Sequence, residues 1–445
     1  MAPDATNLTG ALRRRFAGYG MLGVLLLLCV LFSVLTMQDQ HPTGARAAAE
    51  LATELIGHAE PDAAILILIR DSEQDRGFSD DLAARLRAAG FTAVATAAGG
   101  PPELRAACER LVDDGPADIW LATLTSGLPA ARSIAAAVPG LAGATVLAPA
   151  SYRWPTFLLA DNLRNVANQI AVIAIVAVGM TLVIITAGID LSVGSLIALS
   201  AVVCAWLVRA LGGAGAGAGA LFAAGFGAIA LCALAGLFSG AMIVRFRLPP
   251  FIATLAMMQV ASGVAYIVAR GRPIYDAPES ITTLGRGVDP LAGVPWAVWL
   301  MLLLYAVAHL LMSRTALGRY VYAVGGNPEA ARLAGVRTGA VLLFAYALCG
   351  ALAGLGGVLM ASQLKSGAPT YGLMYELYVI AAVVVGGTSL SGGEGRVLGT
   401  LIGAFIIAVI QNGMNLTNVE SYTQKVVLGL VILGAVLIDR LRRRN

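Results

Sequence analysis

The stretch AVGMTLVIITAGIDLSVGSLIALS, residues 177–200, decides the fold class of this chain. Two apolar runs flank a short break that contains Asp190 and Ser192, and both runs continue beyond the quoted residues. Each run reaches about the 20 residues that a helix needs to cross roughly 30 Å of hydrocarbon. The stretch therefore predicts two membrane-spanning helices joined by a short polar break.

The composition and the other apolar runs extend this prediction to most of the chain. Hydrophobic residues make up 58% of the 445 residues, charged residues only 13%, and the mean hydropathy is +0.79. A soluble domain with so apolar a surface would aggregate. We expect an all-α polytopic membrane protein of about ten transmembrane helices, with a soluble α/β domain inserted between the first and second spans. The expected spans lie near residues 19–37, 166–187, 192–209, 217–243, 251–269, 294–312, 339–362, 374–387, 397–416 and 424–439.

The distribution of arginine predicts the orientation of these spans. Cytoplasmic loops of membrane proteins carry more Lys and Arg than exported loops. With the amino terminus inside, the expected cytoplasmic loops contain Arg245, Arg314 and Arg396 among others, while the loop 270–287 is an exception on the outside. We therefore expect a protein of the bacterial inner membrane with both termini in the cytoplasm and residues 39–157 in the periplasm.

Residues 1–38 combine three arginines with the first apolar run. We expect them to form a cytoplasmic amino terminus and an uncleaved first transmembrane helix. A cleaved signal peptide, with Ala-Arg-Ala at 45–47 as the peptidase site, is the alternative, although the apolar run is long for one.

Residues 39–157 break the membrane pattern. Strand-like runs such as AAILILIRD (63–71) alternate there with segments of helical spacing such as FSDDLAARLRAAG (78–90). Strands that alternate with helices predict a small parallel α/β layer. We expect a soluble domain in this segment and a transmembrane domain over residues 158–445.

A glycine-rich stretch, VVVGGTSLSGGEGR at 383–396, raises the question of a nucleotide site. Leu-Ser-Gly-Gly is the signature of ATP-binding-cassette ATPases, but it works only with a Walker A loop, GxxxxGK[ST]. Neither Lys365 nor Lys425 follows a glycine, so the chain has no such loop. We expect a tight glycine turn on the cytoplasmic side, no cofactor and no metal. The similar Leu-Ser-x-Gly within 185–203 indicates either a parallel internal repeat or a coincidence of Gly- and Ser-rich turns.

Four stretches together resemble the permease subunits of bacterial ATP-binding-cassette sugar importers of the ribose/xylose/galactoside type, which are related to branched-chain amino-acid permeases. The stretches are residues 177–200, LPPFIATLAMM (248–258), GRYVYAVGGNPEAARLAGV (318–336) and AAVVVGGTSLSGGEGRVLGTLIGA (381–404). The resemblance covers Asn162 to the end of the chain, and ordinary members have only a short loop in place of residues 39–157. It implies a transport subunit without catalysis. Its implied partners are a second permease copy, cytoplasmic ATP-binding subunits, a periplasmic solute-binding protein, a sugar or small polar solute, and the lipid membrane, with no nucleic acid.

The segment GGNPEAARLAGV is similar to the family's coupling segment, which docks into the ATPase. Its residues also predict a short self-capped helix, with Asn327 as the cap, Pro328 at the first position and Gly335 where the helix ends. An amphipathic helix on the lipid surface is the alternative. The predicted coupling residues are Asn327, Pro328, Glu329, Ala330, Ala331, Arg332 and Gly335.

Polar residues within the expected spans are candidates for the translocation path. A carboxylate such as Asp190 at bilayer depth costs about 2.5–3.5 kcal/mol, so we expect it either to form a gate in the path or to cap the helix that begins near Val193. For the other polar residues, interhelical hydrogen bonds are the alternative. The candidates for the gate and path are Asp190, Ser192, Gln259, Glu376, Gln411 and Asn412.

The main alternative function is a membrane receptor that binds a small ligand with the exported α/β domain. A receptor would need a cytoplasmic output domain, and none follows the last expected span. An ATP-independent carrier is disfavoured by the coupling segment. We therefore expect an ATP-driven importer of a sugar or similar small polar solute.

The α/β domain resembles one lobe of the periplasmic sugar-binding proteins, which hold sugar between two lobes. Ligands of parallel sheets bind beyond the carboxyl ends of the strands, which points to Asp71, Ser72, Thr123 and Ser126. One lobe alone would leave a sugar half solvated. We expect the domain to dock the delivering protein or a neighbouring subunit, and an insertion without a role is the alternative.

Overall fold

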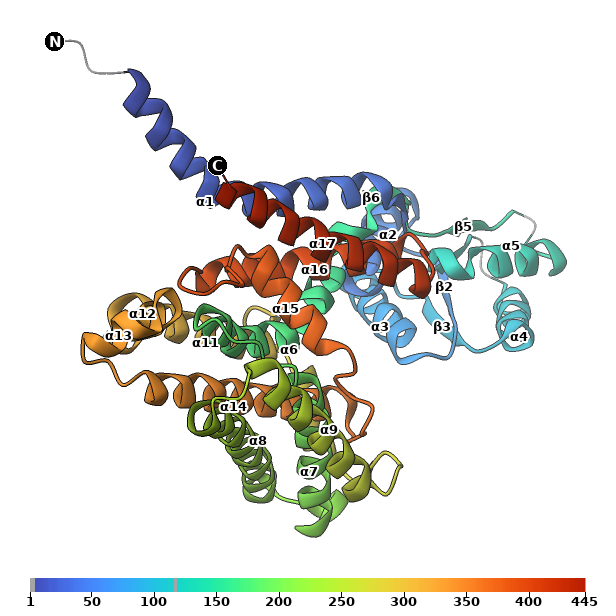
Figure 1. The fold of residues 1–445 in the computed structure, drawn as a ribbon. Helices are drawn as coiled ribbons and strands as arrows, with labels where there is room; N and C mark the ends of the chain where they lie inside the picture. Colours follow the sequence, from blue (N-terminus) through green and yellow to red (C-terminus); the bar gives the residue numbers. More distant parts are fainter. Residues whose placement is uncertain (1–4, 116–117, 142, 445) are drawn as a thin grey trace. The chain divides into compact units, whose positions relative to one another are not determined.

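A computed structural model describes residues 5–115, 118–141 and 143–444 of the chain, which divides into two compact units (Figure 1). One unit consists of Met1–Thr36 together with Phe157–Asn445, and the other is Met37–Thr156. The second unit therefore interrupts the sequence of the first.

The unit Met37–Thr156 contains a four-stranded parallel sheet with the strand order β3-β2-β4-β5. In the centre of this sheet, Ile65 of β2 lies opposite Val94 on one side and Trp120 on the other. The parallel α/β layer predicted from the sequence is confirmed. Its strands are β2 (Ala64–Ile69), β3 (Val94–Ala98), β4 (Ile119–Thr123) and β5 (Thr145–Leu147).

Helices cover both faces of this sheet because the side chains of β2 alternate between two apolar cores. Ile65 and Ile67 lie in the core with α2 and α3, whereas Leu66 and Leu68 lie in the core with α4 and α5. All six residues of β2 are buried, as is usual for a parallel strand covered on both sides. The helices are α2 (Gly44–His58), α3 (Glu73–Ala88), α4 (Pro101–Asp113) and α5 (Leu128–Ala137), with a 3₁₀ turn η1 (Thr125–Gly127) before α5.

A two-stranded antiparallel ribbon joins the two ends of the same unit. Strand β1 (Met37–Gln40) pairs with β6 (Tyr152–Pro155), so that Met37 lies opposite Pro155 and Gln40 opposite Tyr152. The unit therefore begins and ends at neighbouring positions.

The larger unit is helical. Within the described residues, seven helices are long and apolar enough to cross a membrane. They are α6 (Ala160–Ile185), α7 (Val193–Ala210), α8 (Ala218–Phe246), α9 (Pro250–Ala269), α11 (Trp296–Arg314), α14 (Thr338–Leu364) and α16 (Val397–Leu416). Short elements precede or connect them: η2 (Thr156–Leu158) lies before α6, and η3 (Gly213–Gly215), η4 (Glu279–Thr282), α10 (Thr283–Arg286), α12 (Ala316–Gly326) and α13 (Pro328–Leu333) lie between the helices.

Three of the ten predicted spans coincide with shorter apolar helices. These are Gly20–Leu35 in α1 (Ala5–Leu35), α15 (Tyr375–Val385), and Ser421–Gly434 in α17 (Ser421–Arg444). With 11 residues, α15 rises only about 17 Å, roughly half of the hydrocarbon thickness. It begins at Tyr375, one residue after the predicted start, because Met374 immediately before it has a left-handed backbone with φ 68°.

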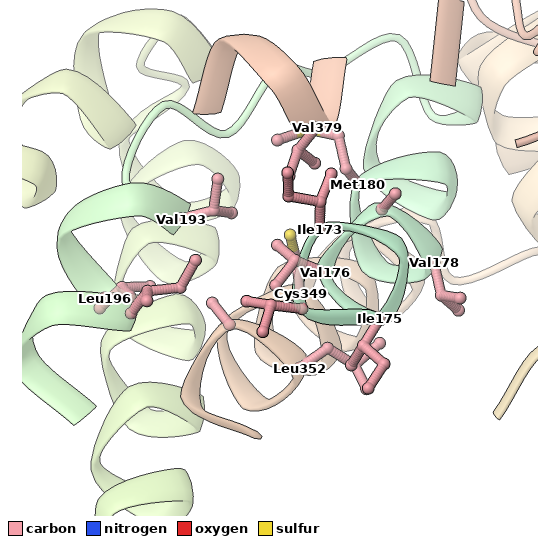
Figure 2. Packing of buried hydrophobic residues seen from close by; sticks show 14 of the residues in the cluster. Ile173, Ile175, Val176, Val178, Met180, Val193, Leu196, Cys349, Leu352 and Val379 are labelled. Atoms are coloured by element: carbon pink, nitrogen blue, oxygen red, sulfur yellow. The ribbon is translucent and has the colours of Figure 1, made fainter. Parts of the chain in front are cut away.

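The core of the helical unit is built around α6, which is buried on all sides from Ile170 to Ile185. Side chains of four helices meet there, as Figure 2 shows for Val176 of α6, Leu196 of α7, Cys349 of α14 and Val379 of α15. Glycines bring α14 and α8 together, since a methyl group added at Gly350 would lie 3.1 Å from Cα of Gly236. Small residues at such crossings are typical of helices packed in membranes.

Candidate functional site

The break between α6 and α7 holds a buried carboxylate. Asp190 and Ser192 are both fully buried. One carboxylate oxygen of Asp190 accepts hydrogen bonds from the backbone N–H of Ser192 at 2.9 Å and from its hydroxyl at 2.6 Å. Ser192 precedes the first residue of α7, and its hydroxyl accepts no bond from the helix. Asp190 thus fixes the turn that starts α7.

The second carboxylate oxygen of Asp190 is buried without a hydrogen-bond partner within the described structure. The hydroxyl of Tyr346, on α14, lies beside the same break, because a methyl group added at Gly188 would overlap it. The hydroxyl oxygen of Tyr346 also lacks a partner in the described part of the chain. Each buried polar group without a partner costs about 1–3 kcal/mol, so these groups lower the stability of the apolar core. Costs of this kind are found where a function requires the polar groups.

Glu376 lies at the same end of α7. A methyl group added at Gly194, in the first turn of α7, would overlap a carboxylate oxygen of Glu376. A negative charge beside a helix N-terminus is favourable, because the first N–H groups of the helix point toward it. The structure thus brings Asp190, Ser192 and Glu376 together around the start of α7, although Glu376 is far from the other two in sequence.

Glu376 follows an irregular segment, residues 365–374, that runs beside α7. A methyl group added at Gly367 would lie 2.7 Å from Cβ of Ala205, and one added at Gly372 would lie 2.9 Å from Cβ of Ile197. The segment therefore follows α7 from its second half toward its first turn. Non-helical backbone at membrane depth is tolerated only where it is buried in protein or lines a water-filled cavity.

The remaining path candidates lie elsewhere in the helical unit. Gln259 is exposed on α9, and Gln411 is half-buried on α16. Asn412 forms a reciprocal amide pair with Asn162, with N···O distances of 2.8 and 3.0 Å, which ties α16 to the start of α6. Asn162 and the break at Asp190 lie at opposite ends of α6, so Asn412 is an interhelical contact away from the cluster.

The segment 327–335 forms a short helix, α13, with its own cap. The side-chain oxygen of Asn327 accepts a 3.0 Å hydrogen bond from the backbone N–H of Ala330, and Pro328 occupies the first position. Glu329 and Arg332 form an exposed ion pair at 2.8 Å. The helix ends before Gly335, which has a φ of 85° that favours glycine.

Two side chains of α13 have opposite environments. Ala331 is buried with 5% exposure, whereas Leu333 is 83% exposed. Leu333 is not among the coupling residues predicted from the sequence, because a leucine within an apolar chain is normally a core residue. Leu333 is the one large apolar side chain that α13 exposes.

The glycine-rich stretch forms a tight turn between α15 and α16, as expected. Gly387, Gly392 and Gly393 have φ values of 87°, 83° and 75°, which only glycine adopts without strain. The backbone N–H of Ser389 closes the turn with a 3.0 Å hydrogen bond to the carbonyl O of Glu394.

A cavity of about 250 Å³ lies at the opposite end of α7. Trp206 and Arg209 of α7 and Arg270 after α9 line it, and Arg209 also pairs with Asp276 at 3.5 Å. None of the predicted path residues lines this cavity.

In the α/β unit, the residues at the carboxyl ends of β2 and β4 are already engaged. Asp71 pairs with Arg76, and the hydroxyl of Ser72 accepts a 3.1 Å bond from the first turn of α3. The buried hydroxyl of Thr123 donates a 2.7 Å bond to the carbonyl O of Leu68. Ser126 lies in the adjoining 3₁₀ turn. Three of the four predicted ligand residues thus serve the local structure.

Comparison with known proteins shows what the helical unit is. Residues 162–436 match the family described as branched-chain amino acid transport system / permease component. The chain belongs to this permease family. The ribose import permease of Escherichia coli (strain K12) is 46% identical over 287 residues, which are 64% of this chain and 87% of that protein.

Two further relatives agree with the match to the permease. The ribose import permease of Bacillus subtilis (strain 168) is 42% identical over 288 residues, covering 64% of this chain and 87% of that protein. The L-arabinose ABC transporter permease protein of Azospirillum brasilense is 35% identical over 292 residues, covering 65% of this chain and 83% of that protein. No solved structure is significantly similar to the chain.

These relatives confirm the family resemblance and the transport function. The permease is a multi-pass membrane subunit of a bacterial ATP-binding-cassette importer, and it is a transport subunit, not an enzyme. An importer permease of this kind works with an ATPase and a solute-binding protein. The α/β unit Met37–Thr156 lies outside the residues that match the family.

Proposed function

We propose that this permease imports a sugar or a similar small polar solute, driven by a separate cytoplasmic ATPase. The observation that carries the proposal is the 46% identity to a ribose import permease over 87% of that protein's length. Because an arabinose permease is also among the relatives, the proposal covers pentoses and related sugars.

We propose that the solute passes along the start of α7. Support comes from the gathering of Asp190, Ser192 and Glu376 there and from the irregular segment beside α7. Glu376 is half-buried, so its carboxylate is both held by the bundle and accessible to a polar solute. Carboxylates accept strong hydrogen bonds from hydroxyl groups, which are the groups a sugar presents.

The remaining path residues fit less directly. Gln259 is exposed on α9, the least covered of the seven candidate spans. An exposed amide within an apolar helix is unfavourable against lipid. We propose that a second permease copy covers it, so that Gln259 lines a path or an interface between two copies. Asn412 then serves packing between helices through its pair with Asn162, and Gln411 remains a candidate for the path.

We propose that α13 is the coupling helix that docks into the ATPase. Support comes from its cap at Asn327, which holds the first turn of this six-residue helix, and from the exposure of Leu333. The ion pair of Glu329 and Arg332 stiffens the same exposed face. A rigid helix with one large apolar side chain is suited to a groove in a partner.

We further propose ten membrane passes, with the three shorter apolar helices completing the seven longer ones. Both termini then lie in the cytoplasm, and residues 39–157 form a periplasmic domain, as the arginine distribution indicates. The engaged residues Asp71, Ser72 and Thr123 leave the α/β unit poorly suited to hold a sugar by itself. We propose that this unit docks the periplasmic solute-binding protein.

Reconstitution tests the transport function directly. The permease would be placed in liposomes with the ATPase and binding protein of the same importer, and uptake of radiolabelled ribose, arabinose and galactose would be measured with and without ATP. We expect ATP-dependent uptake of at least one sugar. Uptake that proceeds equally without the ATPase, or the absence of uptake of all three sugars, would contradict the proposal.

A matched pair of variants tests the path. Glu376→Gln keeps the shape of the side chain but removes the charge beside α7, and we expect uptake to fall at least roughly tenfold, the effect of losing one charge-assisted hydrogen bond. Glu420→Gln removes an exposed carboxylate between α16 and α17 and serves as the control. Equal uptake by the two variants would exclude Glu376 from the path.

A further inference from the structure

The glycine turn, residues 387–396, is bonded to two helices that are distant in sequence. The backbone N–H of Gly393 donates a 2.8 Å hydrogen bond to the carbonyl O of Ile185, the last residue of α6. The hydroxyl of Tyr322, on α12, donates a 2.8 Å hydrogen bond to the carbonyl O of Gly395. The turn therefore holds the end of α6 and the body of α12 at once.

Gly325 lies where α6, α12 and the glycine turn meet. A methyl group added at Gly325 would overlap the carbonyl O of Ile185 and would lie 2.6 Å from the backbone N of Gly393. Gly325 is buried in the last turn of α12. The three segments thus touch backbone to backbone at this point, with no side chain between them.

The junction is connected directly to α13. Asn327 ends α12, where its backbone N–H donates a 3.1 Å hydrogen bond to the carbonyl O of Ala323. The side chain of the same residue caps α13 through the backbone N–H of Ala330. One residue therefore ends one helix and begins the next, so α12 and α13 have no flexible linker between them.

The junction also reaches the break that holds Asp190. A methyl group added at Gly392 would lie 2.8 Å from Cβ of Ala187, so the turn packs on the first residues after α6. Ala187 has a left-handed backbone with φ 60°, and Asp190 follows three residues later. Closely packed backbone does not compress, so a displacement on one side of such a contact is passed to the other side.

We propose that the glycine turn is the mechanical link between the ATPase-docking helix α13 and the gate at the α6–α7 break, and that Gly325 and Tyr322 are its positioning residues. When α13 moves, α12 moves with it, and the junction carries the displacement to Ile185 and Asp190. The proposal rests on the function proposed above. It gives the Leu-Ser-Gly-Gly stretch a role in transmitting force rather than in binding nucleotide.

Two adjacent glycines provide the test. Gly325→Ala inserts a methyl group into the junction, whereas Gly326→Ala has no heavy atom within 4 Å of the added group. The measurement is sugar uptake per ATP hydrolysed in liposomes that contain the complete importer, together with co-purification of the ATPase. We expect Gly325→Ala to bind the ATPase but to lower uptake per ATP at least about tenfold, within the usual range of coupling between sites. Gly326→Ala should match the wild type.

A milder pair keeps the test valid if Gly325→Ala does not fold. Tyr322→Phe removes only the hydroxyl that bonds to Gly395 and should lower uptake per ATP by about two- to tenfold, the factor for one hydrogen bond. Tyr320→Phe, at an exposed position of the same helix, should have no effect. Wild-type coupling in both Gly325→Ala and Tyr322→Phe would overturn the link while leaving the transport function intact. An absence of ATP-dependent uptake in the wild-type importer would instead overturn the proposed function.

Discussion

Leu333 provides a quantitative test of the docking role of α13. Its side chain is 83% exposed, so it contributes little to the packing of the permease itself. Leu333→Ala removes three carbon atoms, each worth about 0.8 kcal/mol if docking buries them. Since most of the side chain is exposed before docking, we expect a loss of about 2 kcal/mol, which corresponds to roughly a 30-fold weaker affinity for the ATPase.

The assay is a titration of the purified ATPase onto the permease in lipid nanodiscs, with the dissociation constant as the readout. Leu291→Ala is the matched control, because Leu291 is 97% exposed but lies in the loop before α11 and not on α13. Both variants should keep the thermal stability of the wild-type permease. If Leu333→Ala binds the ATPase within about twofold of the wild type, or no more weakly than Leu291→Ala, the docking face of α13 has been assigned wrongly.

Three further outcomes follow from local contacts. Asn412→Leu removes the amide pair with Asn162 and should destabilise the solubilised permease by about 1–2 kcal/mol, seen as a lower midpoint of thermal unfolding. The pKa of the Glu279 carboxyl lies below its ordinary value of 4.5, chiefly because the carboxylate accepts a hydrogen bond from Lys365. This contact therefore stabilises the fold above pH 4.5, and its contribution is lost as the pH falls through the lowered pKa. Lys365→Gln should remove that part of the acid dependence of thermal unfolding, and an unchanged profile would contradict the assignment. Burial raises the pKa of the Cys108 thiol from 9.0 to about 11, which lowers its thiolate fraction about 100-fold. Maleimide should therefore label this thiol at neutral pH only after the α/β unit unfolds.

The amino-acid sequence was sufficient to predict the helical class, the inserted α/β layer and the short capped helix at 327–335. Each of these follows from a local pattern: long apolar runs, strand–helix alternation, and an asparagine and a proline before a glycine. The irregular segment 365–374 falls between two predicted spans, so a connection there was predicted, but its course beside α7 was not, because that course depends on the close contacts of Gly367 and Gly372 with α7. The predicted span at 374–387 corresponds to the 11-residue helix α15, which lies within it.

The cluster of Asp190, Ser192 and Glu376 was also only partly predictable from the sequence. Asp190 and Ser192 stood out because they interrupt an apolar run, but the approach of Glu376 to Gly194 is a tertiary contact between distant segments. Gly325 appeared as one of two consecutive glycines before Asn327. Only the structure distinguishes them, because one has no room for a methyl group and its neighbour has ample space.

The ribbon formed by β1 and β6 bears on how this chain came to carry an additional domain. Because Met37 lies opposite Pro155, the chain leaves the α/β unit beside the point at which it entered. A short connection could therefore replace the whole unit between α1 and α6. Such a module can be gained, lost or exchanged for another without altering the course of the transmembrane helices. We expect that a short turn joining residue 36 to residue 157 would leave the fold of the helical unit intact.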